Sequence, residues 1–442
     1  MAKAAGRLFR FGNGKRKLNT NMKNLLTVIT LVLSGLFITT SVVAQNRSVE
    51  FEHSKWSKVL KKAKKENKLI FVDCYTSWCG PCKMMAKDVF TQDHVADYFN
   101  ENFVNFKIDM EKGEGPDLKP GWKINAYPTF LVINSKGEVV HRVVGAYKAD
   151  EFITYMKEAQ SEDKNYAALK KKYEEGQRDG EFMFSYLRSL RMANLGKEEA
   201  AKADAYISSL KKEDLLKKEN WNIVKYFMKN PATDEFRFLV RNRTKLAEVI
   251  GIEEVDAKIY KTYNKKIEEY SYFYPGKGRV YDKKGFDALV SDLQNSNYEK
   301  ASELIAIALK NEYSRLNDWD KYAYVVDAAL DFSLWKNNEK ALSYFDSAAS
   351  TIAKASKDKA MLERALRWAD YASTNENRVQ YKSGYLATKA NLLELVGNAE
   401  EAKATQSASK EADLKAEKEG TKIISIPAFK MGGMKPAKGK KK

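Results

Sequence analysis

The sequence has little cysteine and little histidine, and both shortages exclude kinds of protein. Its 442 residues include three cysteines and three histidines. Three cysteines in so long a chain do not make a disulfide scaffold. A structural zinc site takes four ligands, and His53, His94 and His141 form no pair at metal-ligand spacing. Proline is also scarce, with eight residues, and abundant Ala, Leu, Lys and Glu favour helix for most of the chain.

Positive charge is in excess overall, but the body of the chain has little of it. The formal net charge is +18, of which +7 lies in residues 1–44 and +7 in residues 403–442, leaving +4 for residues 45–402. A nucleic-acid-binding surface needs a basic stripe on the folded part, so we expect no nucleic acid as a partner. The length predicts two or three domains of about 100–200 residues each.

Acidic residues are absent from positions 1–44, and this end has the features of a targeting signal. A basic segment precedes the uncharged run LLTVITLVLSGLFITTSVVA, residues 25–44, whose end matches a small-x-small cleavage pattern. We expect a cleaved signal peptide and a periplasmic or otherwise exported protein. The alternative is an uncleaved membrane anchor through residues 25–44. Met22 would itself start such a signal, so residues 1–21 are interpreted as an extension of the reading frame.

Residues 45–160 alternate between β-type and helical runs, which predicts one compact α/β domain. LIFVDCY, residues 69–75, is a continuous run typical of a strand buried on both faces. Asp73 within it is costly unless its carboxylate has a partner or a chemical role. Further strands are expected at 103–109, 129–134 and 139–145. Helices are expected from about Trp56, at 81–90 and at 148–159, with one more short helix that begins after a cap at Thr91 or Asp93.

Residues 161–420 carry helical patterns only. Polar turns there recur as GKEEA (196–200), SNYEKA (296–301), NNEKA (337–341) and GNAEEA (397–402), each ending in an alanine expected at a close-packing point. This pattern of helices and recurring turns predicts an irregular helical-repeat array resembling tetratricopeptide solenoids. The alternative is a non-repetitive helical bundle. Residues 421–442 are expected to form a flexible basic tail, either solvated or in weak contact with an anionic membrane surface.

All three cysteines lie in DCYTSWCGPCK, residues 73–83, where Cys79 and Cys82 form a C-x-x-C motif. The motif follows the buried strand and opens a helix, so Cys79 lies where free N–H groups and the helix dipole favour the thiolate. The thiolate is the attacking species in disulfide exchange, and Cys82, one turn further in, would be shielded and placed to resolve the mixed disulfide. Redox chemistry is favoured over a purely structural disulfide, which would close only a tiny loop, and over zinc.

Residues 50–160 resemble the thioredoxin family. FVDCYTSWCGPCK matches the family's active-site strand and WCGPC(K) signature, AYPTFLVI its proline loop, and VVGAYKADEF its last strand, glycine and helix. The insertion VFTQDHVADYFNENF is similar to that in the exported thioredoxin-like domain of thiol:disulfide interchange proteins. The resemblance implies a thioredoxin-like α/β domain at residues 45–160, followed by the all-α region.

The resemblance also implies roles for individual residues. Cys79 would attack and Cys82 resolve, Asp73 would exchange a proton with the resolving thiol, Lys107 would neighbour Asp73, and Pro128 would be the cis-proline facing the disulfide. Contacts with the substrate are implied for Trp78 at the rim, the Tyr127 backbone, Gly80, Pro81, Thr129 and Gly145. No cofactor is expected besides the redox-active disulfide.

Two features depart from the family pattern. DLKPGWKIN, residues 117–125, has Pro120 and Gly121 where the family usually has a helix, so the resemblance leaves the surface beside the site open there. Cys74 is an extra thiol in the buried strand and is interpreted as a small core residue. The alternative is a regulatory or mispairing thiol.

The sequence thus predicts an exported thiol–disulfide oxidoreductase, more specifically a protein-disulfide reductase, whose helical region docks a client or partner. The expected partners are protein disulfides and a membrane electron-delivery protein, because a periplasmic reductant needs an electron source. The alternative is a helical-repeat scaffold in which the thioredoxin-like domain is a docking module with a minor redox role. The size of the helical region favours the scaffold, whereas the complete set Cys79, Cys82, Asp73, Lys107 and Pro128 favours the enzyme.

Overall fold

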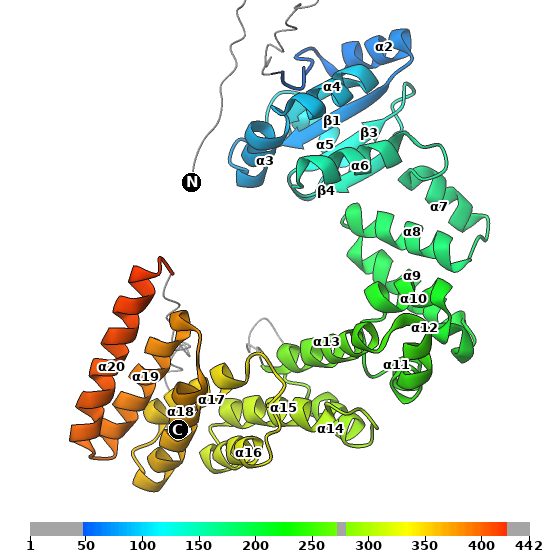
Figure 1. Ribbon diagram of the computed structural model, residues 1–442. Helices are drawn as coiled ribbons and strands as arrows, with labels where there is room; N and C mark the ends of the chain where they lie inside the picture. Colours follow the sequence, from blue (N-terminus) through cyan, green and yellow to red (C-terminus); the bar gives the residue numbers. More distant parts are fainter. Residues whose placement is uncertain (1–46, 272–279, 422–442) are drawn as a thin grey trace, which may run out of the picture. The chain divides into compact units, whose positions relative to one another are not determined.

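The computed structural model describes residues 47–271 and 280–421 (Figure 1). Within these ranges the chain forms two compact units, one holding residues 47–139 and 144–158, and the other residues 140–143 and the chain from 159 onward. The predicted signal or anchor run and all but the first residue of the predicted basic tail lie outside the described residues. In the part of the chain that the structure describes, no helix is long and apolar enough to cross a membrane.

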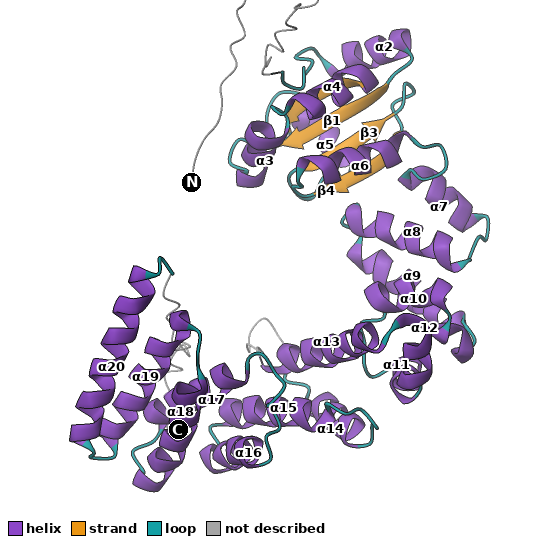
Figure 2. Ribbon diagram, viewed as in Figure 1, coloured by secondary structure: helices purple, strands orange, loops and turns teal. Residues whose placement is uncertain are grey.

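The first unit contains β1, β2 and β3 of a four-stranded sheet, whose strand order is β2-β1-β3-β4 (Figure 2). The central strand β1 (Leu69–Tyr75) pairs in parallel with β2 (Phe103–Asp109) and antiparallel with β3 (Thr129–Ile133). The edge strand β4 (Val139–Val144) follows β3. All four predicted strands are confirmed, with ends that differ by no more than one residue.

The side chains of β1 alternate between two buried faces, as its continuous apolar run predicts. Ile70, Val72 and Cys74 point to one face, in a core that includes side chains of β2 and β3. Phe71 points to the other face, where its ring lies 4.6 Å from that of Phe99. Rings around Phe71 on this second face come from Phe51, Phe90, Phe99, Phe103, Phe130 and Phe152.

The helices of the first unit are α2 (Trp56–Glu66), α3 (Gly80–Met84), the π-helical turn η1 (Met85–Val89), α4 (Asp93–Asn102), α5 (Gly115–Gly121) and α6 (Ala149–Gln160). The predicted helix at 81–90 is therefore confirmed as α3 continued by η1. The predicted cap of the next helix is wrong, because the N-cap is Gln92 and its side chain makes no capping hydrogen bond.

Helix α5 covers the first part of residues 117–125, the segment that departs from the family pattern. Residues 117–121 are helical despite Pro120, because Pro116 occupies the first turn, where no backbone donor is needed. Pro120 lies so close to the end that the helix loses little hydrogen bonding there. Gly115 is required at the start, since a Cβ atom at this position would lie 2.0 Å from the carbonyl oxygen of Asp109.

From residue 161 onward the described residues form helices joined by turns and loops, with no strand among them, as predicted for residues 161–420. The helices of the second unit are α7 (Tyr166–Glu174), α8 (Gly180–Met192), α9 (Gly196–Ser209), η2 (Lys212–Leu216), α10 (Lys218–Phe227), α11 (Asp234–Arg241), α12 (Arg243–Ile250), α13 (Ile252–Ser271), α14 (Lys283–Gln294), α15 (Ala301–Leu316), α16 (Trp319–Asp331), α17 (Ala341–Ala355), α18 (Lys359–Asn375), α19 (Val379–Leu395) and α20 (Ala399–Lys418). The four recurring phrases lead into α9, α15, α17 and α20. That these helices form tetratricopeptide-like repeats stays a prediction.

The alanines of the recurring phrases are buried at three of the four places. Ala301, Ala341 and Ala402 are buried, but Ala200 is exposed. In α9 the buried stripe instead starts at Glu199, whose carboxylate is paired with Arg191 at 3.0 Å and with Lys229 at 2.8 Å. In α9 the buried position is therefore Glu199, one residue before the alanine of the phrase, and an ion-paired carboxylate is buried where the other three helices bury an alanine.

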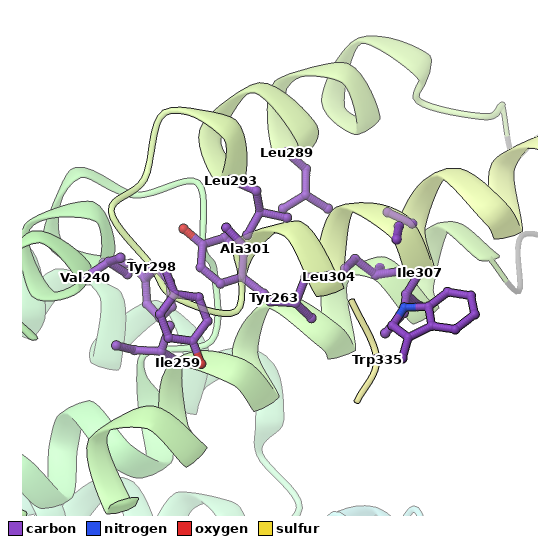
Figure 3. Close-up of a cluster of buried hydrophobic side chains, with 14 of the residues drawn as sticks. Val240, Ile259, Tyr263, Leu289, Leu293, Tyr298, Ala301, Leu304, Ile307 and Trp335 are labelled. Atoms are coloured by element: carbon purple, nitrogen blue, oxygen red, sulfur yellow. The ribbon is translucent and has the colours of Figure 1, made fainter. Parts of the chain in front are cut away.

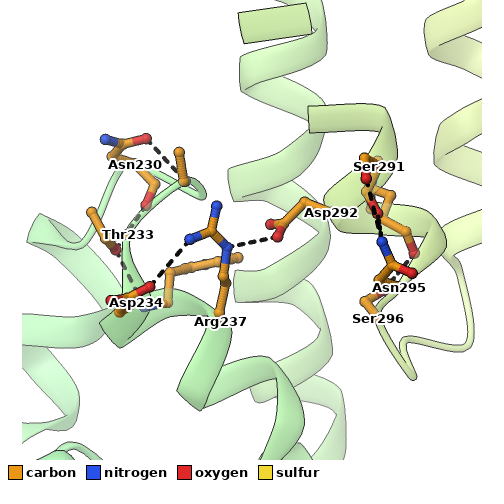
Figure 4. Close-up of polar contacts among 11 residues, drawn as sticks. Asn230, Thr233, Asp234, Arg237, Ser291, Asp292, Asn295 and Ser296 are labelled. Atoms are coloured by element: carbon orange, nitrogen blue, oxygen red, sulfur yellow. Dashed lines mark hydrogen bonds and ion pairs between the residues drawn. The ribbon is translucent and has the colours of Figure 1, made fainter. Parts of the chain in front are cut away.

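Consecutive helices of the second unit share one hydrophobic core. Figure 3 shows Leu293, Ala301 and Leu304 packed around Tyr263 on α13. A polar contact joins α11 to α14, where Arg237 Nε donates to Asp292 Oδ1 at 2.6 Å (Figure 4). This arginine also pairs with Asp234 on its own helix at 3.2 Å.

Candidate active site

The two cysteines of the C-x-x-C motif form a disulfide at the start of α3. The Cα atoms of Cys79 and Cys82 are 5.3 Å apart. Cys79 is the N-cap residue, and the backbone N–H of Cys82 donates to its Sγ at 3.1 Å. Since a donor directed at this sulfur also stabilises a negative charge on it, the cap geometry favours a Cys79 thiolate in the reduced form. Cys79 is 3% exposed and Cys82 4%, so burial in this oxidised state does not distinguish the attacking from the resolving thiol.

Asp73 lies in the middle of β1 and is paired with a lysine of the neighbouring strand. In the parallel register Asp73 is opposite Lys107, and Lys107 Nζ lies 3.3 Å from Asp73 Oδ2. Asp73 is 1% exposed, and apart from this ion pair no hydrogen-bond donor reaches its carboxylate among the described residues. Burial raises the pKa of Asp73 to about 6, and the Lys107 ammonium opposes this rise. The carboxyl group can therefore take up or release a proton near neutral pH.

The proline loop has the backbone geometry that the resemblance implies. The Tyr127–Pro128 peptide bond is cis. The Gly145 N–H donates to the Pro128 carbonyl at 3.0 Å, and Gly145 has a φ of +109°, which favours glycine. Thr129 is buried, and its hydroxyl donates to the Ala126 carbonyl at 2.8 Å. These contacts join the loop to the end of β4.

The rim of the site carries a large exposed aromatic side chain. Trp78 is 64% exposed, and its ring lies edge-on to Tyr127 with 5.9 Å between the ring centres. Its indole Nε1 donates to Glu111 Oε2 at 2.9 Å. Gly80 and Pro81 of the motif are exposed beside it. The predicted rim position of Trp78 agrees with this arrangement, and contact with a substrate stays a prediction.

Sequence reasoning missed residues that contact the predicted ones. Glu111 follows β2 by two residues, and no local pattern marks it as the partner of Trp78. Tyr75 lies two residues after Asp73 and therefore on the same side of β1, a period-two signal that the sequence did contain. Phe51 contacts Lys107 across a long sequence separation, so no local signal existed for it.

Cys74 is a fully buried cysteine that takes no part in the disulfide, and it lies on the opposite face of β1 from Asp73. Its burial supports the interpretation as a small core residue. Among the described residues, no group of three or more His, Cys, Asp or Glu side chains could hold a metal ion.

Known proteins match the first unit. A family profile described as "Thioredoxin-like domain" matches residues 56–160. Thioredoxin H4 of Arabidopsis thaliana is 40% identical over 95 residues, which are 22% of this chain and 75% of that protein. Thioredoxin H2 of the same plant is 34% identical over 105 residues, 23% of this chain and 73% of that protein.

Solved structures also match this part of the chain. A protein of Bacteroides thetaiotaomicron, described as a proposed disulphide-isomerase, is 51% identical with a TM-score of 0.25, over 26% of this chain and 95% of that one. The oxidised C-terminal domain of DsbD from Neisseria meningitidis is 24% identical with a TM-score of 0.22, over 24% of this chain and 91% of that domain. The sequence relatives, together with the disulfide in the matched motif, show that the chain belongs to the thioredoxin family of thiol–disulfide oxidoreductases.

Proposed function

We propose that this chain is an exported, periplasmic protein-disulfide reductase whose helical unit docks its client or its electron donor. The observation that carries the proposal is the Cys79–Cys82 pair combined with a buried Asp73 that titrates near neutral pH. Export is inferred from residues 25–44, either as a signal peptide or as an anchor. The docking role of the helical unit is part of the same proposal.

One turnover begins with the reduced chain. The Cys79 thiolate attacks one sulfur of a client disulfide, forming a mixed disulfide while the other client sulfur leaves as a thiolate. The Cys82 thiol passes its proton to the Asp73 carboxylate and attacks Cys79 Sγ. The Cys79–Cys82 bond forms, the second client sulfur leaves, and protons taken up by the client complete its dithiol. Two electrons move from the chain to the client, and the disulfide seen here is the end state.

Another turnover needs a dithiol reductant that returns two electrons to Cys79–Cys82. In an oxidising compartment this donor must draw electrons from across the membrane, so a membrane electron-delivery protein is the proposed partner. No cofactor takes part in the proposed reaction. The basic tail is proposed to remain solvated, with contact to an anionic membrane surface as the alternative.

The test uses the chain from residue 45 onward, reduced and mixed with a protein disulfide. Cys79→Ser should abolish reduction of the client, and Cys82→Ser should accumulate a covalent mixed disulfide because the resolving step is lost. Cys74→Ala is the matched control and should keep the full rate. Full activity of Cys79→Ser would contradict the mechanism. A cellular phenotype that survives loss of both active-site cysteines, but not loss of residues 161–420, would favour the scaffold function.

A further inference from the structure

Three polar or aromatic side chains share one face of the sheet because of strand geometry. Asp73 and Tyr75 are two residues apart on β1 and point to the same side. Lys107 is opposite Asp73 in the parallel register of β1 and β2. The ammonium of Lys107 therefore emerges between the Asp73 carboxylate and the Tyr75 ring.

Two aromatic rings and one carboxylate surround this ammonium. Lys107 Nζ lies 3.3 Å from Asp73 Oδ2, 4.8 Å from the centre of the Tyr75 ring and 5.5 Å from the centre of the Phe51 ring. Both rings are within the distance of about 6 Å at which a ring face attracts a cation. The Lys107 side chain is 25% exposed, so its flexible stem could otherwise place the charge in solvent.

The Phe51 ring is held in place by an extended segment that precedes α2. The N–H of Glu52 donates to the Asn105 carbonyl at 2.8 Å, and Glu52 forms a parallel bridge with Phe106. The ring itself packs against Phe90, with 5.6 Å between the ring centres. This segment thus fixes a ring beside Lys107, although it lies far from β2 in sequence.

We propose that Tyr75 and Phe51 are positioning residues, whose ring faces hold the Lys107 ammonium beside Asp73 and away from solvent. Neither ring touches the reacting sulfurs in this proposal; both act through Lys107 and Asp73. The proposal rests on disulfide exchange at Cys79 and Cys82, in which Asp73 takes the proton of Cys82.

Among the groups around Asp73, the Lys107 ammonium is the charge that favours ionisation of the Asp73 carboxyl group. On β3 the register partner of Asp73 is Phe130, which is apolar. The two cysteines at the start of α3 form a disulfide and do not titrate in this oxidised state. Burial raises the pKa of Tyr75, and the nearby Asp109 and Asp73 carboxylates raise it further, so the ring stays neutral. When the ammonium leaves, the Asp73 carboxylate loses the charge that offsets its burial and becomes harder to ionise.

The experiment follows the γ-carboxyl carbon of Asp73 by NMR in the oxidised full chain between pH 4 and 9, with Asp73→Asn identifying the signal. Tyr75→Leu should move the titration midpoint upward by about half a pH unit, and Phe51→Leu should move it upward by less. Tyr75→Phe keeps the ring face and should leave the midpoint unchanged. Lys107→Met should raise it more than either leucine variant.

A double variant and a control make the test specific. Adding Tyr75→Leu to Lys107→Met should cause no further shift, because the ring acts only through the ammonium. Tyr98→Leu removes another ring near a lysine, Lys157 at 5.9 Å, and should leave Asp73 unchanged. The proposal would be overturned if the titration midpoint of Asp73 stayed unchanged in both Tyr75→Leu and Phe51→Leu. It would also be overturned if Tyr75→Leu shifted the midpoint as much in the Lys107→Met background as in the natural chain. Since the titration needs no turnover, its failure is distinguishable from failure of the reductase function.

Discussion

Replacing Asp73 by asparagine should change how the stability of the first unit depends on pH. The folded pKa of Asp73 is about 6, against 3.8 for an unperturbed aspartate. At about 1.4 kcal/mol per pKa unit, ionising this group in the folded state costs about 3 kcal/mol. The raised pKa means that the cost is absent below about pH 4, grows as pH rises through 6, and is complete above it. The asparagine side chain has no charge and avoids the cost at every pH.

The predicted quantity is therefore the difference in unfolding free energy between Asp73→Asn and the natural chain, compared at two pH values. The stability of Asp73→Asn relative to the natural chain should rise by about 2–3 kcal/mol between pH 4 and pH 8, because a small part of the cost is already present at pH 4. A constant penalty for burying the amide cancels in this comparison. Native-state hydrogen exchange of the β1 and β3 amides in the oxidised full chain measures it, since it reports on the first unit separately. A relative stability that is the same at pH 4 and pH 8 would refute the assignment of a costly buried carboxylate.

Two further substitutions and one labelling experiment test other parts of the first unit. Gly145→Ala should destabilise it by about 1–2 kcal/mol because φ is +109° there, whereas the matched Gly121→Ala, at a negative φ with open space around it, should be nearly neutral in the same exchange measurement. Phe71→Ala removes the central ring of an aromatic cluster and should cost about 3–5 kcal/mol; thermal unfolding of the two chains measures this, and a loss below 1 kcal/mol would contradict the packing. Alkylation of the reduced native chain, read by mass spectrometry, should label at most two thiols because Cys74 is fully buried, and a third label would show that it is reactive.

Much of the first unit could be predicted from its sequence because its elements have strong local patterns. The run at 69–75 has no polar alternation, and the structure buries both of its faces. The motif CGPC, residues 79–82, also determines the structure of its neighbours, since it opens α3. For residues 117–125 the sequence left the local structure open, because Pro120 disfavours a helix whereas Pro116 in the first turn allows one, and a helix forms as far as Gly121.

The contacts between distant segments could not be predicted in this way. Glu111 bonds to Trp78, and Phe51 lies beside Lys107, only because strands bring these segments together. The exposed Ala200 shows a related limit in the helical unit. A phrase of five residues does not determine which side of the following helix is buried, since one residue turns the helix by about 100°.

The reduction potential of the Cys79–Cys82 pair in residues 45–442, equilibrated against glutathione or dithiothreitol buffers, tests the central claim most directly. The account predicts a strongly reducing value near roughly −270 mV, as for thioredoxin, so that the chain gives electrons to client disulfides. A value near roughly −120 mV would contradict it and make the chain a catalyst of disulfide formation.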